Sequence, residues 1–577
     1  VKHTNTLANS VSHVGLIVDT NRRLTVNGDS GLSNSYGLTL NGEIDLTGRS
    51  QLIQTNDSDL TVSSSGRIQR DQQGTSNSFN YNYWSSPVST TNNTANNIGY
   101  TISDVFKDGT TTAPQDISWV GDADGSATSP ISLSNYWQYT FRNQTDSYAN
   151  WEYIGPTGSL NTGDGFTLKG SGAAGSTQNY TFVGKPNNGL INRPVAAGNL
   201  ALVGNPYPSA LDADEFIRDN INPGGNAGTT GSIIGTLYFW QHSPANNSHV
   251  TVNYIGGYAT YTLAGGTVAS GTGLGGAGTG DPSLYAFRPR RYVPVGQGFF
   301  VEGATSQLQS NIQFRNSQRA FVKEDNASST PMLRQAANTA EPANVESPST
   351  NHYKKIWFFY TSANQQYRET LLSFMNEFAT DGYDNGYDAV LFDENASDMY
   401  FLLGDTKLVI QGVGTFNESS QYPIGVKNEV DGNVKFEISQ AENWTTDQPV
   451  YIYDSELDTY NDINGSEFQI NLPAGTYDTR FSIRFTNIPL STNTAINPVN
   501  MTYATESNAL SIVNTDINRI LKSVRIYNLL GQEIDSVELE RGDLARTIIP
   551  LNQYATGTYL VQVETNAEPI SGKIIVK

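Results

Sequence analysis

The stretches “VRIYNLLGQEI” (524–534) and “GTYLVQVET” (557–565) decide the fold at the C-terminal end of the chain. In both, apolar residues alternate with polar ones, as in a strand that has one buried face and one face in water. Neighbouring runs have the same character, and turn residues such as Asn514, Gly531 and Gly557 separate them. The pattern predicts an Ig-like antiparallel β-sandwich over residues 503–577, with further strands at “ALSIVN” (509–514), “ARTIIPL” (545–551) and “SGKIIVK” (571–577).

This region resembles the C-terminal sorting domain of type IX secretion substrates, which are exported proteins of the Bacteroidetes. The resemblance implies a domain that docks on an outer-membrane translocon and its sorting-domain receptor and is then cleaved off outside the cell. The alternative is an ordinary Ig-like domain that caps a multidomain chain. The residues that carry the resemblance are Asn528, Leu529, Leu530, Gly531 and Gln532 at one turn, Gly557 and Tyr559 at the next strand, and Lys577 at the end.

Composition narrows the class of protein. The chain has 577 residues, more than one core usually supports, and a net charge of −21, which argues against a nucleic-acid partner. Cysteine is absent, so disulfides and thiolate metal sites are excluded. The excess of Gly, Tyr and neutral polar residues is typical of an extracellular β-protein. Together with this composition, the resemblance to a sorting domain implies a protein that passes through the periplasm and ends at the cell surface or in the medium.

The N-terminus does not read as an export signal. Val1 is not an initiator, and the first twenty or so residues lack a basic segment followed by a sufficient apolar core. Either a signal peptide has been removed or the chain is the C-terminal part of a longer protein, and we favour the second interpretation. No run reaches the roughly 18 apolar residues that a transmembrane helix needs.

Residues 1–75 repeat a Leu-Thr-aliphatic strand followed by Asn or Ser and Gly, as in “LTVNGD” (24–29) and “LTLNGEIDLTGRS” (38–50). Inward aliphatic residues and a glycine-bearing corner are what each coil of a β-solenoid requires. The pattern predicts the end of a longer solenoid region, and a plain β-meander is the alternative.

Residues 76–322 contain an internal duplication, with copies at about 76–200 and 201–322. “GDGFTLKG” (163–170) in the first copy matches “GQGFFVEG” (296–303) in the second, and other motifs follow in the same order. We expect these glycines to form tight turns that deliver Phe166 and Phe299 into the core. The stretch also resembles a region found upstream of the sorting domain in large Bacteroidetes surface proteins.

The remaining segments are predicted from composition and strand pattern. Residues 323–353 are rich in Ala, Ser, Asn, Pro and Glu and predict a flexible linker. Residues 354–488 predict a β-sandwich, in which “ETLLSFMNEF” (369–378) is taken as a strand despite its helical propensity. Residues 489–502 predict a second linker before the terminal domain. The whole chain is thus expected to be an all-β multidomain protein.

No motif marks an enzyme. The five histidines show no zinc-binding spacing, and no Gly-x-Ser-x-Gly element marks a serine nucleophile. A glycoside hydrolase needs only two carboxylates across a cleft, which sequence spacing does not test. The chain is therefore expected not to be an enzyme, with a polysaccharide-degrading or carbohydrate-binding exoenzyme as the alternative.

Two groups of side chains are candidate binding residues. Asp381, Asp384 and Asp388 lie on a glycine-broken loop whose oxygens could bind calcium, or else accept hydrogen bonds from turn amides. No other cofactor is implied. The aromatic candidates for a surface polysaccharide are Trp137, Trp151 and Trp240, which would be duplicated core residues if buried. Together these patterns favour a secreted, adhesin-like surface protein of the kind that gliding bacteria carry.

Overall fold

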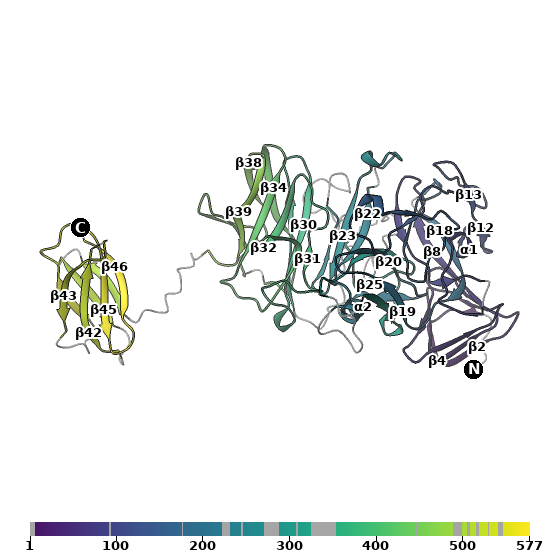
Figure 1. Ribbon diagram of the computed structural model, residues 1–577, viewed down its shortest axis with the longest axis horizontal. Helices are drawn as coiled ribbons and strands as arrows, with labels where there is room; N and C mark the ends of the chain where they lie inside the picture. Colours follow the sequence, from purple (N-terminus) through teal and green to yellow (C-terminus); the bar gives the residue numbers. More distant parts are fainter. Residues whose placement is uncertain are drawn as a thin grey trace. The chain divides into compact units, whose positions relative to one another are not determined.

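A computed structural model describes most of the chain. It describes residues 6–91, 94–175, 177–221, 231–243, 246–270, 288–306, 310–324, 353–445, 447–487, 499–504, 508–514, 519–528, 530–539 and 546–576. Their regular secondary structure is almost entirely β-strand, which confirms the predicted all-β class (Figure 1). The chain divides into two units, Val1–Asn487 and Ile488–Lys577. Among the described residues, no helix is both long enough and apolar enough to cross a membrane.

The first unit begins as a β-solenoid, as the Leu-Thr-aliphatic pattern predicts. Parallel, in-register pairing places Leu24 beside Ile44 and Ile44 beside Ile68, and all three side chains are buried. The corner glycines Gly28 and Gly48 have positive φ, a conformation that favours glycine. One sheet contains β1 (Thr6–Leu7), β3 (Arg23–Val26), β5 (Glu43–Leu46) and β8 (Arg67–Thr75), and the other contains β2 (Val11–Val18), β4 (Gly31–Leu40), β6 (Gln51–Gln54) and β7 (Asp59–Val62).

The two predicted copies share part of their strand pairing. In each, the first strand pairs with a strand near the end of the copy, the second pairs with the one carrying the Gly-x-Gly-Phe motif, and a short helix follows the third. The first copy pairs β8 with β18 (Thr177–Pro186) and β9 (Asn82–Trp84) with β17 (Phe166–Leu168), and contains β10 (Val88–Ser89) and α1 (Ile102–Val105). The second pairs β19 (Ile191–Pro194) with β27 (Asn311–Phe314) and β20 (Leu200–Gly204) with β26 (Gly298–Glu302), and contains β21 (Ala210–Asp212) and α2 (Ala213–Asn220).

Each repeat therefore begins one strand before its predicted start, at β8 in the first copy and at β19 in the second. β8 closes the solenoid sheet and also opens the first repeat, so a boundary at residue 76 divides a paired unit. Gly163 and Gly296 have positive φ, and Phe166 and Phe299 are buried. The turn glycines therefore deliver both phenylalanines into the core, as the motif predicts.

The two copies meet through reciprocal backbone contacts. Trp84 of the first bridges Gln297 of the second, and Val203 of the second bridges Asp164 of the first. Because each copy uses the same pair of segments, the junction has approximate two-fold character. Buried side chains from both copies fill it: Tyr83, Phe141, Leu200, Leu202, Tyr238 and Phe300.

The predicted sandwich is an eleven-stranded sheet curled around a core of its own. “ETLLSFMNEF” forms the end of β30 (Tyr367–Phe374) and a 3-10 turn at Asn376–Phe378, so its strand reading is right for most of its length. The sheet also packs on the second copy, because Phe359 and Tyr367 share a core cluster with Phe299. Its other strands include β29 (Lys354–Thr361), β32 (Asp398–Leu403), β33 (Thr406–Val413), β34 (Gln421–Asn428), β35 (Gly432–Glu442), β36 (Tyr451–Asp454), β38 (Phe468–Leu472) and β39 (Gly475–Arg484). Most of the predicted linker at 323–353 lies outside the described residues.

The second unit is a two-sheet sandwich. One sheet has the order β40-β41-β44 and the other β43-β42-β45-β46. The predicted linker at 489–502 is wrong at its end, because residues 499–502 pair within β40 and Val499 is buried in the core. The strands are β40 (Val499–Ala504), β41 (Ala509–Asn514), β42 (Leu521–Tyr527), β43 (Glu533–Glu538), β44 (Arg546–Pro550), β45 (Gly557–Thr565) and β46 (Ile570–Val576).

Candidate functional site

The motif turn of the terminal unit joins β42 to β43. Asn528 Oδ1 accepts hydrogen bonds from the backbone N–H groups of Leu530 (2.9 Å) and Gln532 (3.0 Å). Asn528 Nδ2 donates to Gln532 Oε1 at 2.9 Å, and Gly531 has φ +78°. The asparagine therefore organises the turn, and glycine supplies the left-handed backbone that the turn needs.

The other motif residues lie at the base of β45. Tyr559 Oη donates to the carbonyl of Ala555 at 2.8 Å, and its ring packs edge-on against Tyr554. Gly557 is the first residue of β45 and pairs with Val576, so its predicted place in a turn is wrong. The chain bends at the preceding residue, Thr556. The strand therefore starts at Gly557 itself and not after it. Leu529 and Lys577 lie outside the described residues.

The candidate tryptophans have two different environments. Trp151 and Trp240 pack against the aromatic cluster between the copies, each with its ring centroid 6.0 Å from that of Tyr83. Trp137 lies elsewhere, where its ring stacks on His249 at 5.0 Å and its Nε1 donates to the carbonyl of Ala123. All three tryptophans are half-buried.

A lysine that the sequence analysis did not identify lies over the ring of Trp137. Lys169 Nζ is 3.9 Å from the ring centroid of Trp137 and 4.3 Å from that of Tyr81, within cation–π range. It contacts His249 Nδ1 at 3.1 Å, and His249 Nε2 contacts Asp124 Oδ1 at 3.0 Å. Burial lowers the pKa of Lys169 to about 8, although the charge of Asp124 opposes the change. The matching position of the second copy is Glu302. This difference between the two motifs is the feature of the sequence that could have drawn attention to Lys169.

Three tyrosines of the first copy are exposed. Tyr136, Tyr148 and Tyr153 are 48%, 79% and 54% exposed. Tyr153 lies on β16 (Glu152–Tyr153), which pairs with β15 (Tyr139–Thr140), and its Oη donates to the carbonyl of Asn135. Tyr148 lies on the 3-10 turn Tyr148–Asn150. We call Tyr136, Tyr148 and Tyr153 the tyrosine face.

Two members of the tyrosine face lie close together, and Tyr148 is only five residues before Tyr153 in the chain. The rings of Tyr139 and Tyr153 are 5.4 Å apart. Asn135, which accepts the hydrogen bond from Tyr153, directly precedes Tyr136. The face is thus a group of exposed aromatic rings with polar edges, in which Tyr136 packs edge-on against the half-buried Trp137.

The acidic loop is organised by its own backbone. Asp384 Oδ2 accepts a hydrogen bond from the Thr380 N–H, and Asp388 accepts from the N–H groups of Asp384 (2.6 Å) and Gly412 (2.8 Å). Burial raises the pKa of Asp388 to about 7 even though both amides favour its charged form. Asp381 is exposed. Within the described part of the chain, no three carboxylate or imidazole groups lie close enough to hold a metal ion.

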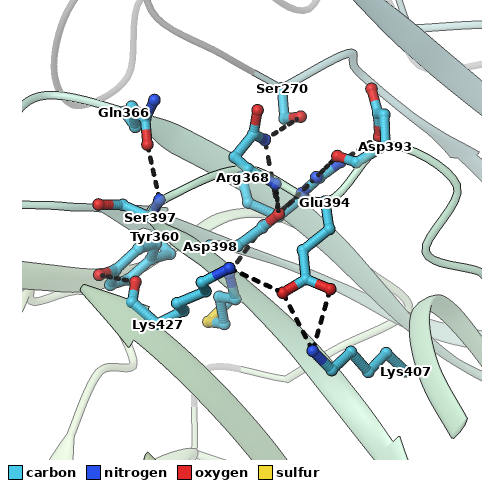
Figure 2. Close-up of polar contacts among 12 residues, drawn as sticks. Ser270, Tyr360, Gln366, Arg368, Asp393, Glu394, Ser397, Asp398, Lys407 and Lys427 are labelled. Carbon is cyan, nitrogen blue, oxygen red and sulfur yellow. Dashed lines mark hydrogen bonds and ion pairs between the residues drawn. The ribbon is translucent and has the colours of Figure 1, made fainter. Parts of the chain in front are cut away.

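A buried polar node joins the curled sheet to the second copy, and the sequence analysis did not identify it. Arg368 Nε and Nη2 contact the two oxygens of Asp398 at 2.7 Å, and Nη1 contacts Asp393 Oδ1 at 3.1 Å (Figure 2). Asp393 Oδ2 accepts the N–H of Tyr258, which lies on β23 (Gly256–Thr262) of the second copy. Glu394, next in the chain, pairs with Lys407 and Lys427 nearer the surface. The node is a fixed structural connection between the two parts.

Comparisons with known proteins give the family. The profile of a family described as “Domain of unknown function (DUF8693)” matches residues 2–485. A second profile, described as “Secretion system C-terminal sorting domain”, matches residues 497–577. No curated protein sequence matches.

Among solved structures, a polysaccharide lyase is 11% identical, with 39% of this chain and 40% of the lyase covered and a TM-score of 0.11. The chain thus spans about two fifths of the lyase. The sorting-domain match covers the whole terminal sandwich, including the turn at Asn528 and the strand at Gly557. The chain belongs to the DUF8693 family, and its terminal unit is a sorting domain that marks it as a substrate of the type IX secretion system.

Proposed function

We propose that this protein is an adhesin-like surface protein of a member of the Bacteroidetes, whose first unit binds a polysaccharide on the tyrosine face. The sorting domain delivers the chain to the cell surface or the medium. The first unit is then the part that acts outside the cell.

The tyrosine face is the observation that carries the binding role. Aromatic rings with a polar edge stack on the C–H faces of sugar rings while their hydroxyls bond to sugar hydroxyls. Tyr148 and Tyr153 are more than half exposed, so a ligand can reach their rings. The half-buried Trp137 packs edge-on against Tyr136 and supports that part of the face.

The nearby charges favour a neutral glycan. Arg142 is paired with both oxygens of Glu152 at 2.8 Å and also contacts Asp164, so this arginine is already neutralised. The protein as a whole has a net charge of −21. A neutral polymer avoids the long-range repulsion that an acidic polysaccharide would meet.

Binding to insoluble neutral polysaccharides tests the proposal. Tyr148→Ala with Tyr153→Ala should weaken binding by about tenfold, from the loss of two aromatic contacts. Tyr36→Ala is the matched control, because Tyr36 is 70% exposed and lies in the solenoid. Equal binding by the double variant and the wild type would reject the tyrosine face as the site. Release of soluble sugars during incubation would favour the exoenzyme alternative.

A further inference from the structure

The terminal unit exposes aliphatic side chains that its own core does not use. In the described residues, ten leucines and isoleucines are exposed, and six of them lie in this unit: Ile520, Leu530, Ile534, Ile548, Leu560 and Ile575. The unit makes up only about a sixth of the chain. Its core is complete without them, since Leu510, Ile526, Val561, Val563 and Ile574 are buried. The exposed aliphatic side chains therefore do not serve the core of this unit, and another role must account for them.

Strand register gathers three apolar residues on one face of the sheet β43-β42-β45-β46. Tyr527 of β42 lies opposite Leu560 of β45, and Leu560 lies opposite Lys573 of β46. Ile575 is two residues beyond Lys573, and it occupies the diagonal position from Leu560 on the same side. Leu560 is 41% exposed and Ile575 is 55% exposed.

The motif turn extends this surface. β42 ends at Tyr527, and the turn organised by Asn528 presents Leu530, which is 85% exposed. Ile534, at the start of β43, is 46% exposed, and a register shift between Ile526 and Tyr527 displaces it from regular pairing. We call Tyr527, Leu530, Ile534, Leu560 and Ile575 the apolar end of the sheet.

Polar and charged side chains lie beside the apolar end. Tyr527 Oη donates to Gln562 Oε1 at 3.1 Å, and Arg525 and Lys573 are exposed on neighbouring strands. An apolar centre with a charged rim is the usual anatomy of a protein–protein interface. Exposed branched residues on a flat strand face also favour aggregation unless a partner covers them.

We infer that the apolar end is the surface through which this sorting domain docks on the protein receptor of the outer-membrane secretion machinery. The family match establishes that the unit is read by that machinery, so a protein partner for this unit exists. The Asn528 turn then has a physical role beyond closing a hairpin, because it holds Leu530 in the docking surface. The opposite sheet, β40-β41-β44, has a different role and needs no contact with the receptor.

Export of the full chain in a type IX-competent host tests the inference. Leu560→Thr with Ile575→Thr removes apolar surface but keeps residues that suit strands. The double variant should slow delivery to the surface by about tenfold and accumulate in the periplasm. Protease accessibility on intact cells, compared with the periplasmic fraction, measures delivery.

Ile548→Thr is the matched control for Ile575→Thr. Ile548 is 54% exposed, against 55% for Ile575, but it lies on β44 of the other sheet. It should be exported at the wild-type rate. Melting curves of the purified full chains should agree within about 2 °C, since substitutions at exposed positions change stability little.

Two results would overturn the inference. One is wild-type export of the double variant, and the other is an equal defect in Ile548→Thr. If the wild-type chain forms dimers by sedimentation, and the double variant is monomeric yet exported normally, the apolar end is instead a self-association surface.

Discussion

At the scale of single residues, burial sets the protonation of several side chains in the first unit. His242 lies at the end of β22 (Leu237–His242), where burial lowers its pKa to about 4 against a weaker opposing hydrogen bond to the Tyr81 backbone. Among the residues that the structure describes, none makes a hydrogen bond with its Nδ1. Burial also lowers the pKa of Lys169 and raises the pKa of Asp388, because loss of water disfavours the charged form of each group.

Acid should therefore destabilise the first unit through His242. Above pH 6.5 the ring is neutral in both the folded and the unfolded state. As the pH falls from 6.5 towards 4, the unfolded state binds a proton that the folded state does not, so stability is lost across that window. At pH 5 the loss from this group is about 2 kcal/mol.

The check is the melting temperature at pH 7.5 and pH 5.0 for the wild type and His242→Gln. Glutamine can keep the bond to the Tyr81 backbone but does not titrate, so its melting temperature should fall less on acidification. An identical fall in both proteins would contradict a depressed pKa for His242.

At the scale of elements, the hairpin β42–β43 shows which glycine its turn requires. Gly531 has φ +78°, a conformation that costs an alanine about 1–2 kcal/mol. Gly557 begins a strand, and the nearest atoms to an added Cβ are 3.9 Å away. The two glycines look equivalent in the motif and differ in backbone conformation.

Gly531→Ala should therefore destabilise the hairpin by about 1 kcal/mol, whereas Gly557→Ala should be neutral or slightly stabilising. Hydrogen exchange of β42 and β43 in the full chain measures this, with faster exchange expected only for Gly531→Ala. Faster exchange of the same size in Gly557→Ala would show that the motif needs glycine at both positions for another reason.

At the scale of the whole molecule, the first unit joins repeats that the sequence suggests are separate. The solenoid ends in the first strand of the duplication, and the curled sheet shares a core with the second copy. The Arg368 node strengthens this last connection, because Arg368 is the buried counter-charge for both Asp393 and Asp398 (Figure 2). The solenoid, duplication and curled sheet are therefore parts of one unit.

Arg368→Met should destabilise this unit by about 3–5 kcal/mol, because it leaves two carboxylates without their counter-charge. Lys407→Met is the control: Lys407 and Glu394 are about one third exposed, and Lys427 still pairs with Glu394, so about 1 kcal/mol or less should be lost. Melting temperatures measure both. Equal shifts would show that the node contributes no more than a surface ion pair.

Sequence alone determined the features that depend on local periodicity and turn chemistry. The period of two predicts the terminal strands, the Gly-bearing corners predict the solenoid, and the Gly-x-Gly-Phe motifs predict the turns that bury Phe166 and Phe299. These patterns also carried the resemblance to a sorting domain, since its motif residues lie in one hairpin and the strand that pairs with it.

Only tertiary structure decided which side chains reach solvent and which meet across the chain. Trp151 and Trp240 are half-buried because the two copies face each other, whereas Tyr148 and Tyr153 remain exposed on the same part of the first copy. Arg368 meets Asp393 through the folding of one sheet over a neighbouring repeat, and Leu560 meets Tyr527 through strand register. Such contacts depend on long-range packing, which leaves no periodic signal in the residues themselves.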